Sequence, residues 1–104
     1  MATDLYEELA VPYIAVLYPI EVNQEWIRRA EYPELPGCVA EAATAIEAME
    51  QLEARRIQML VEMHFRGEVP PRPRPPLKSG LASHGSVDVD RIIERVADSR
   101  QGRR

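Results

Sequence analysis

Apolar and polar residues alternate over residues 13–22 of this chain. The apolar members are Ile14, Val16, Tyr18, Ile20 and Val22. A period of two residues predicts a β-strand with one packed face. Pro19 lacks a backbone N–H, so we expect this strand to lie at an edge of the sheet or to contain a bulge.

Residues 22–25 predict a turn. A second, antiparallel strand is predicted over residues 26–32, with Trp26, Ala30 and Tyr32 on one face. Two prolines and Gly37 follow in residues 33–37 and predict a tight, rigid connection, in which Gly37 adopts a conformation that other residues avoid. Residues 38–41 are expected to pair as a third strand.

The apolar spacing changes to that of a helix after Thr44. Thr44 and Glu47 form a capping-box pattern, good helix formers continue to Arg66, and Gly67 supplies the stop. Such a helix is about 33 Å long. The face expected to pack on the sheet comprises Ala45, Ala48, Met49, Leu52, Met59, Leu60 and Met63, with Arg56 in its middle.

A second apolar group, Ile46, Ile57 and Val61, lies on a flank of the predicted helix. Two interpretations stay open: the flank meets another subunit or a partner, or it widens the face that enters the core.

The two ends of the chain carry weaker signals. Asp4 resembles a helix cap and predicts a short helix up to about Ala10. Residues 70–76 form a polyproline spacer, for which a role as ligand of a proline-binding domain is the minor alternative. Residues 87–89 are expected to form a brief strand, and Asp90 to cap a last short helix. The apolar residues of that helix are Ile92, Ile93 and Val96.

The length of 104 residues suits a single domain. The pattern predicts an α+β fold, in which one long helix packs on an antiparallel sheet of three or four strands. We expect this domain, with its short N-terminal helix, over residues 1–76. Residues 77–104 are expected to form a flexible, basic C-terminal tail with a possible short strand and helix.

The net charge of −4 hides an asymmetry. Residues 1–65 carry 12 acidic and 4 basic side chains, whereas residues 66–104 carry 5 acidic and 9 basic ones. An acidic body repels nucleic acid and attracts basic proteins. An RNA-binding protein would be a suitable basic partner.

Residues for catalysis are sparse. Cys38 is the single cysteine, so no internal disulfide forms and a cytoplasmic location is expected. The segment around Cys38 predicts a small buried residue rather than a nucleophile. His64 and His84 are twenty residues apart, which does not match a metal-ligand spacing, and no glycine-rich phosphate loop is present. We therefore expect no enzyme activity, no metal and no cofactor, and neither a secretion signal nor a membrane span.

The order of motifs resembles the HicB-like antitoxin family of type II toxin-antitoxin systems. The resemblance covers residues 13–71: two strands, the Pro33-Glu34-Leu35-Pro36-Gly37-Cys38 turn, a third strand, Thr44 with Glu47-Ala48, the long helix, then Arg66-Gly67-Glu68 and Pro70-Pro71. It implies a degenerate ribonuclease-H-like fold, similar to the N-terminal domain of HicB, without the catalytic carboxylates.

The resemblance also implies a function, which is to bind and neutralise a small basic HicA-like RNA-cleaving toxin, with autoregulation at an operator. The alternative is an orphan HicB-like dimeric regulatory or scaffold protein without toxin or DNA binding. We expect a homodimer or higher homo-oligomer. About 28 residues follow Pro76, which is short for a helix-turn-helix module, so DNA binding stays an open question. The sequence names neither the toxin nor the operator.

The candidate interface residues form two groups. The first group, expected at a contact with a subunit or toxin, comprises Tyr32, Pro33, Leu35, Pro36, Ile57 and Val61. The alternative for the prolines is that they serve the turn alone. The second group holds possible tail contacts at Ile92, Ile93 and Val96.

Overall fold

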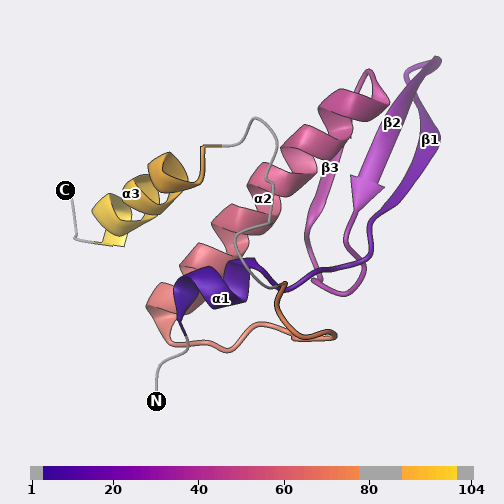
Figure 1. The fold of residues 1–104 in the computed structure, drawn as a ribbon. Helices are drawn as coiled ribbons and strands as arrows, with labels where there is room; N and C mark the ends of the chain where they lie inside the picture. The colour runs from indigo at the N-terminus through magenta and orange to yellow at the C-terminus, as the bar shows by residue number, and fades with distance from the viewer. Residues whose placement is uncertain (1–3, 78–87, 101–104) are drawn as a thin grey trace.

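The fold is α+β, with a three-stranded antiparallel sheet and one long helix (Figure 1). The computed structural model describes residues 4–77 and 88–100. All three helices lie on the same side of the sheet, and the other side carries none of them (Figure 1). Within the described residues the sheet has three strands, the lower of the two expected numbers. The same residues include no helix that is both long and apolar enough to cross a bilayer.

Strands β1 (Val16–Val22) and β2 (Glu25–Glu31) form the expected hairpin. Asn23 and Gln24 connect them with φ angles of 52° and 68°. Two consecutive positive φ values are the mark of a type I′ turn, whose twist matches that of the strands. The strand order is β1-β2-β3. The edge position that Pro19 predicted is therefore confirmed.

Residues 32–38 form a tight loop between β2 and β3 (Val39–Ala42). The amide of Cys38 donates to the carbonyl of Leu35 at 3.0 Å, and the amide of Tyr32 donates to the carbonyl of Cys38 at 3.0 Å. Gly37 has a φ of 89°, as its place in the turn predicted. The loop aligns β3 with β2 so that Ala40 stands opposite Ala30.

Helix α2 (Ala45–Arg66) has the predicted ends. The Thr44 side chain accepts a hydrogen bond from the amide of Glu47 at 3.1 Å, and Gly67 ends the helix with a φ of 77°. Both β2 and β3 pack against α2. The core at this contact includes Ala30, Ala48, Leu52 and Leu60, each 0% exposed.

Helix α3 (Val89–Arg100) packs against α2. Its start differs from the prediction in two respects. Val89 begins the helix instead of ending a strand, and the capping side chain is Asp88, which accepts from the amide of Arg91 at 3.1 Å. Residues 88–100 thus contain the short helix that was expected in the C-terminal tail, and this helix packs on α2. The other expected tail positions, 78–87 and 101–104, lie outside the described residues.

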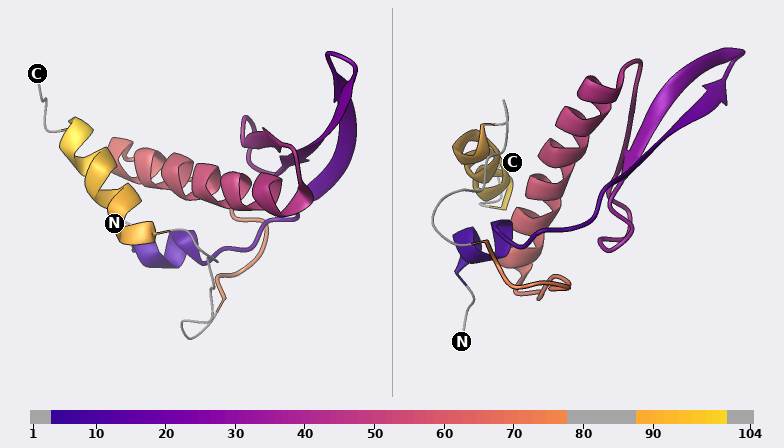
Figure 2. Two further views of the ribbon diagram at one scale, coloured as in Figure 1. Left: turned by 90° about the horizontal axis from the view of Figure 1, so that it is seen from above. Right: turned by 45° about the vertical axis from the view of Figure 1, so that its right-hand side comes forward.

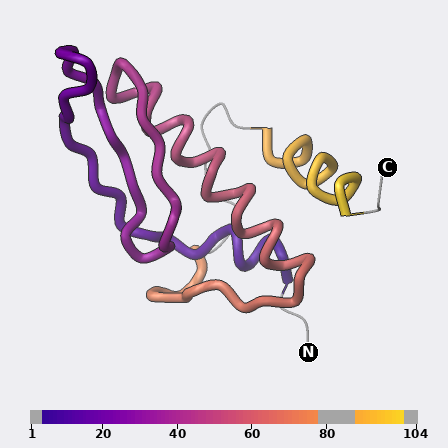
Figure 3. Tube along the Cα trace, turned by 180° about the vertical axis from the view of Figure 1, so that it is seen from behind, coloured from indigo at the N-terminus to yellow at the C-terminus, as the bar shows by residue number. Residues whose placement is uncertain are grey.

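Helix α1 (Leu5–Leu9) was predicted correctly, and Asp4 caps it by accepting from the amide of Tyr6 at 3.0 Å. Helix α1 packs near the C-terminal half of α2, and the proline-rich segment passes beside it (Figures 2 and 3). Two hydrogen bonds hold that segment near its two ends. The Leu77 amide donates to the Ala10 carbonyl at 2.8 Å, and the Tyr13 hydroxyl donates to the Pro71 carbonyl at 2.6 Å.

Candidate protein-binding surface

The expected interface residues around the proline turn divide between surface and core. Pro33 and Pro36 are exposed, whereas Tyr32 is 8% and Leu35 2% exposed. Tyr32 and Leu35 are therefore core residues in this structure, because the loop folds back and turns them inward. Only the two prolines are accessible to a partner here.

The other expected interface residues lie on α2 and α3, which pack against each other. Ile57 and Val61 of α2 are 0% exposed, while Ile92 and Val96 of α3 are 6% exposed and Ile93 is partly buried in the same core. Helix α3 packs on α2, so Ile57 and Val61 widen the core, whereas Ile46, the third residue of the flank, is exposed. Neither set offers a free surface.

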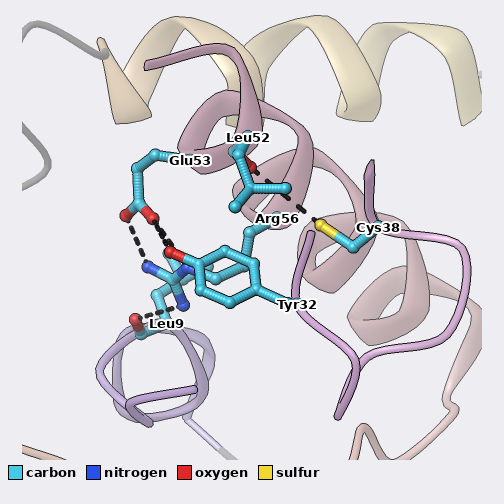
Figure 4. Close-up of polar contacts among 6 residues, drawn as sticks. All are labelled: Leu9, Tyr32, Cys38, Leu52, Glu53 and Arg56. Atoms are coloured by element: carbon cyan, nitrogen blue, oxygen red, sulfur yellow. Dashed lines mark hydrogen bonds and ion pairs between the residues drawn. The ribbon is translucent and has the colours of Figure 1, made fainter. Parts of the chain in front are cut away.

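A buried polar cluster surrounds Arg56, which is 6% exposed (Figure 4). Its guanidinium donates to Glu53 at 2.7 and 3.0 Å and to the Leu9 carbonyl at 3.0 Å. The Tyr32 hydroxyl donates to the same Glu53 carboxylate at 3.1 Å. These bonds join α1, α2 and the proline loop, so the cluster is structural. Burial, with the negative charge of Glu53, raises the pKa of Tyr32 to about 12.

Cys38 is 2% exposed, as expected for a small core residue. Burial raises the pKa of its thiol to about 11, so the nucleophilic thiolate is scarce at neutral pH. The thiol faces the carbonyl of Leu52 at 4.0 Å. Cys38 therefore packs α2 against the loop and offers no chemistry.

Glu34, in the proline loop, holds the proline-rich segment. Arg74 donates to its two carboxylate oxygens at 2.8 and 2.9 Å and also to the Pro12 carbonyl at 3.3 Å. The Ile14 amide donates to Glu34 at 3.0 Å. Residues 70–77 are thus a strap pinned across the loop rather than a free proline-rich ligand.

We expect the ion pair between Glu34 and Arg74 to weaken as the pH falls. Hydrogen bonds from Arg74 and then from Ile14 lower the pKa of Glu34 below its ordinary 4.5. A lowered pKa in the folded state stabilises the fold above the unfolded-state pKa, and this contribution is lost as the pH falls through the folded-state pKa. The ¹³C chemical shift of the Glu34 carboxyl should titrate with a midpoint below pH 4.5. Arg74→Gln should raise this midpoint toward the ordinary value. A midpoint that Arg74→Gln leaves unchanged would contradict the contact.

The β1–β2 turn and the first turn of α2 both lie toward the same end of the molecule (Figures 1 and 3), although Figure 2 shows the turn standing away from the helix. Each of these two segments has an exposed large apolar residue in or next to it. Trp26 is 63% and Ile46 73% exposed. Trp26 shares the α2-facing side of β2 with Ala30, as predicted, but it is not packed. The last residue of β3, Ala42, stands opposite Arg28. Trp26 lies two residues further along the hairpin, beyond the strand and helix that would cover it.

Carboxylates accompany this apolar pair. Glu21 is the cross-strand partner of Trp26, and Glu47 and Glu50 lie in the first two turns of α2. All three are exposed, and none of them forms an ion pair with another described residue. We call Glu21, Trp26, Ile46, Glu47 and Glu50 the acidic end. It combines a large aromatic side chain with unneutralised negative charge, which suits a basic protein.

The sequence analysis missed the acidic end because it read Trp26 as a packed residue. A signal was present in the lengths of the strands. The hairpin extends further than the four-residue β3 can follow, so residues near its turn have no neighbour on that side. Comparing strand lengths would have placed Trp26 outside the core.

Residues 4–77 and 88–100 contain no group of three or more His, Cys, Asp or Glu side chains placed to hold a metal ion. Comparisons of the chain with protein-family models, with curated proteins and with solved structures found no match.

Proposed function

We propose that this protein is a cytoplasmic, HicB-like antitoxin that binds a small basic, HicA-like RNA-cleaving toxin at the acidic end. The observation that carries the proposal is the exposed Trp26 together with carboxylates that form no ion pair with another described residue. Large aromatic side chains dominate binding energies at protein interfaces, and unpaired charge of one sign steers a partner of the other sign.

The local resemblance to the HicB-like family supports the same function. The tight loop with Gly37 at positive φ, the capped helix and the exit after Gly67 have the conformations that the motif residues demand. The degenerate ribonuclease-H-like assignment is part of the proposal. The protein acts by occupying the toxin, so its own side chains carry out no reaction.

The proposal is tested by co-expression with the neighbouring small basic open reading frame and measurement of the affinity of the purified complex. Trp26→Ala should weaken binding at least about 30-fold, since truncating a central aromatic anchor costs about 2 kcal/mol or more. Val69→Ala is the matched control, because Val69 is 80% exposed but lies in the segment between α2 and the strap. Its affinity should be unchanged.

Charge supplies a second measurement on the same complex. Glu47→Lys with Glu50→Lys should slow association and make it less sensitive to salt, because steering by exposed charges is screened. Equal losses in Trp26→Ala and Val69→Ala would contradict binding at the acidic end. The lack of any complex would contradict the antitoxin itself and favour the orphan regulatory protein.

A third function, a nuclease that retains ribonuclease-H-like activity, is tested separately. Metal-dependent cleavage of RNA–DNA hybrids should be zero under our proposal. Cleavage activity that co-purifies with the protein would contradict the antitoxin function and indicate a nuclease.

A further inference from the structure

We infer that the face of the sheet that points away from α2 binds the same face of a second copy of this chain, about a two-fold axis that passes through Ile27. The inference concerns a surface separate from the acidic end, and it does not depend on the proposed toxin.

The strand register identifies this face. Ala30 and Ala40 pack on α2, so the alternate residues of each strand point to the opposite side. Residues that stand opposite each other share a face. The apolar residues of the outer face are therefore Val16, Tyr18, Ile20, Val22, Ile27 and Val39.

The outer face is largely apolar, and none of the described helices covers it. Val16 and Val22 are each 39% exposed, and Tyr18, Ile20 and Ile27 are only partly buried. All helices lie on the other side of the sheet (Figure 1). An antiparallel sheet with one wet side normally shows polar residues there. A continuous apolar row along β1 instead indicates that another surface packs on it.

Some polar residues of the face have partners within the chain. Arg29 donates to Glu41 at 2.7 Å, and the Tyr18 hydroxyl donates to Glu31 at 3.0 Å. Such pairing lowers the cost of removing these side chains from water when the face is covered.

The charges along β2 select a second copy as the occupant. Ile27 has Glu25 two residues before it and Arg29 two residues after it, all on the outer face. A two-fold axis through Ile27 places Arg29 of one copy opposite Glu25 of the other, twice. The same axis places Ile27 and Ile20 each opposite their own counterpart, so apolar residues also meet apolar residues. The surface is self-complementary, as a two-fold interface requires.

The open edge of β1 is a poorer interface than its face. Val22 and Glu25 close a two-residue turn and form a hydrogen-bonded pair, and such pairs alternate along the hairpin. Pro19, three positions from Val22, is therefore in a non-hydrogen-bonded pair with Arg28, and its nitrogen faces the open edge. Because proline has no N–H, the middle of that edge cannot donate to an added strand.

The size of the face sets the expected strength. Seven-residue strands extend about 24 Å, and three strands span roughly 10 to 14 Å. A footprint of about 300 Å² per copy, or about 600 Å² in total, is smaller than the roughly 1,200 to 2,000 Å² of stable interfaces and falls among weak, transient contacts. We therefore expect a dimer that dissociates on dilution.

The mass of the full chain, measured by sedimentation over a range of concentrations, tests the inference. The parent should shift from monomer to dimer as concentration rises. Ile27→Asp should weaken the dimer at least about tenfold, because it buries a charge at the axis. Ile46→Asp, at the acidic end, is the matched control and should leave the dimer unchanged. Circular dichroism confirms that each variant is folded.

Charge exchange makes the test specific. Glu25→Lys alone and Arg29→Glu alone each place like charges opposite one another and should be monomers at concentrations where the parent is a dimer. A mixture of the two variants restores both pairs of opposite charges and should form a heterodimer. A parent that stays monomeric, a dimer that Ile27→Asp leaves intact, or a mixture that stays monomeric would each overturn the inference.

Discussion

Arg56→Met will lower the free energy of unfolding by about 3 kcal/mol, which corresponds to a fall in melting temperature of roughly 15 °C for a domain of this size. Among the side chains of the described residues, only that of Arg56 donates to the Leu9 carbonyl. Arg56 also compensates the charge of Glu53. Methionine fills a similar volume but removes the Arg56 cation from Glu53 and the Arg56 donor from the Leu9 carbonyl. Breaking a buried pair from one side costs about 3 to 5 kcal/mol. We take the low end because the Glu53 side chain is 18% exposed.

The neighbouring Arg55 supplies the control. Arg55 is exposed and lies one residue away on the same helix. Arg55→Met should change the free energy of unfolding by no more than about 0.5 kcal/mol. Urea denaturation followed by circular dichroism measures both. Equal stability of the two variants would show that Arg56 does not hold α1 against α2.

Gly37→Val will lower the free energy of unfolding by about 2 kcal/mol, with the loss arising in the backbone. The φ of 89° at Gly37 lies in a region that β-branched residues rarely adopt. Space is not the cause. A Cβ built at Gly37 would meet the nearest atom, the Met59 methyl carbon, at 3.8 Å, an ordinary contact. Thermal denaturation of the full chain measures the effect.

Gly37→Asn separates backbone strain from crowding. Asparagine, like valine, adds a branched side chain, but it tolerates positive φ. Gly37→Asn should therefore lower the free energy of unfolding by less than half as much as Gly37→Val. Similar losses for the two variants would place the cause in packing. An unchanged melting temperature in Gly37→Val would mean that residue 37 does not adopt positive φ in solution.

Local signals were sufficient for most of the elements. Thr44 and Gly67 mark the ends of α2 because each satisfies backbone groups within a few residues of itself. Pro19 indicated an edge strand for a similar reason, since the missing N–H is a property of that residue alone. Local signals did not decide which apolar residues stay accessible, because that depends on distant residues. The sequence treated Tyr32, Leu35, Ile57 and Val61 as candidate contacts, and the structure buries all four.

The sequence by itself determined the order and kind of the main elements, the tight loop at Gly37 and the acidic character of the N-terminal two-thirds, because these depend on neighbours along the chain. The tertiary structure alone decided which apolar residues remain accessible. Helix α3 reaches back to cover Ile57 and Val61 of α2, the short β3 leaves Trp26 exposed, and no described helix packs on the outer face of the sheet. Burial is a property of what packs on a residue, and that neighbour can lie anywhere in the chain.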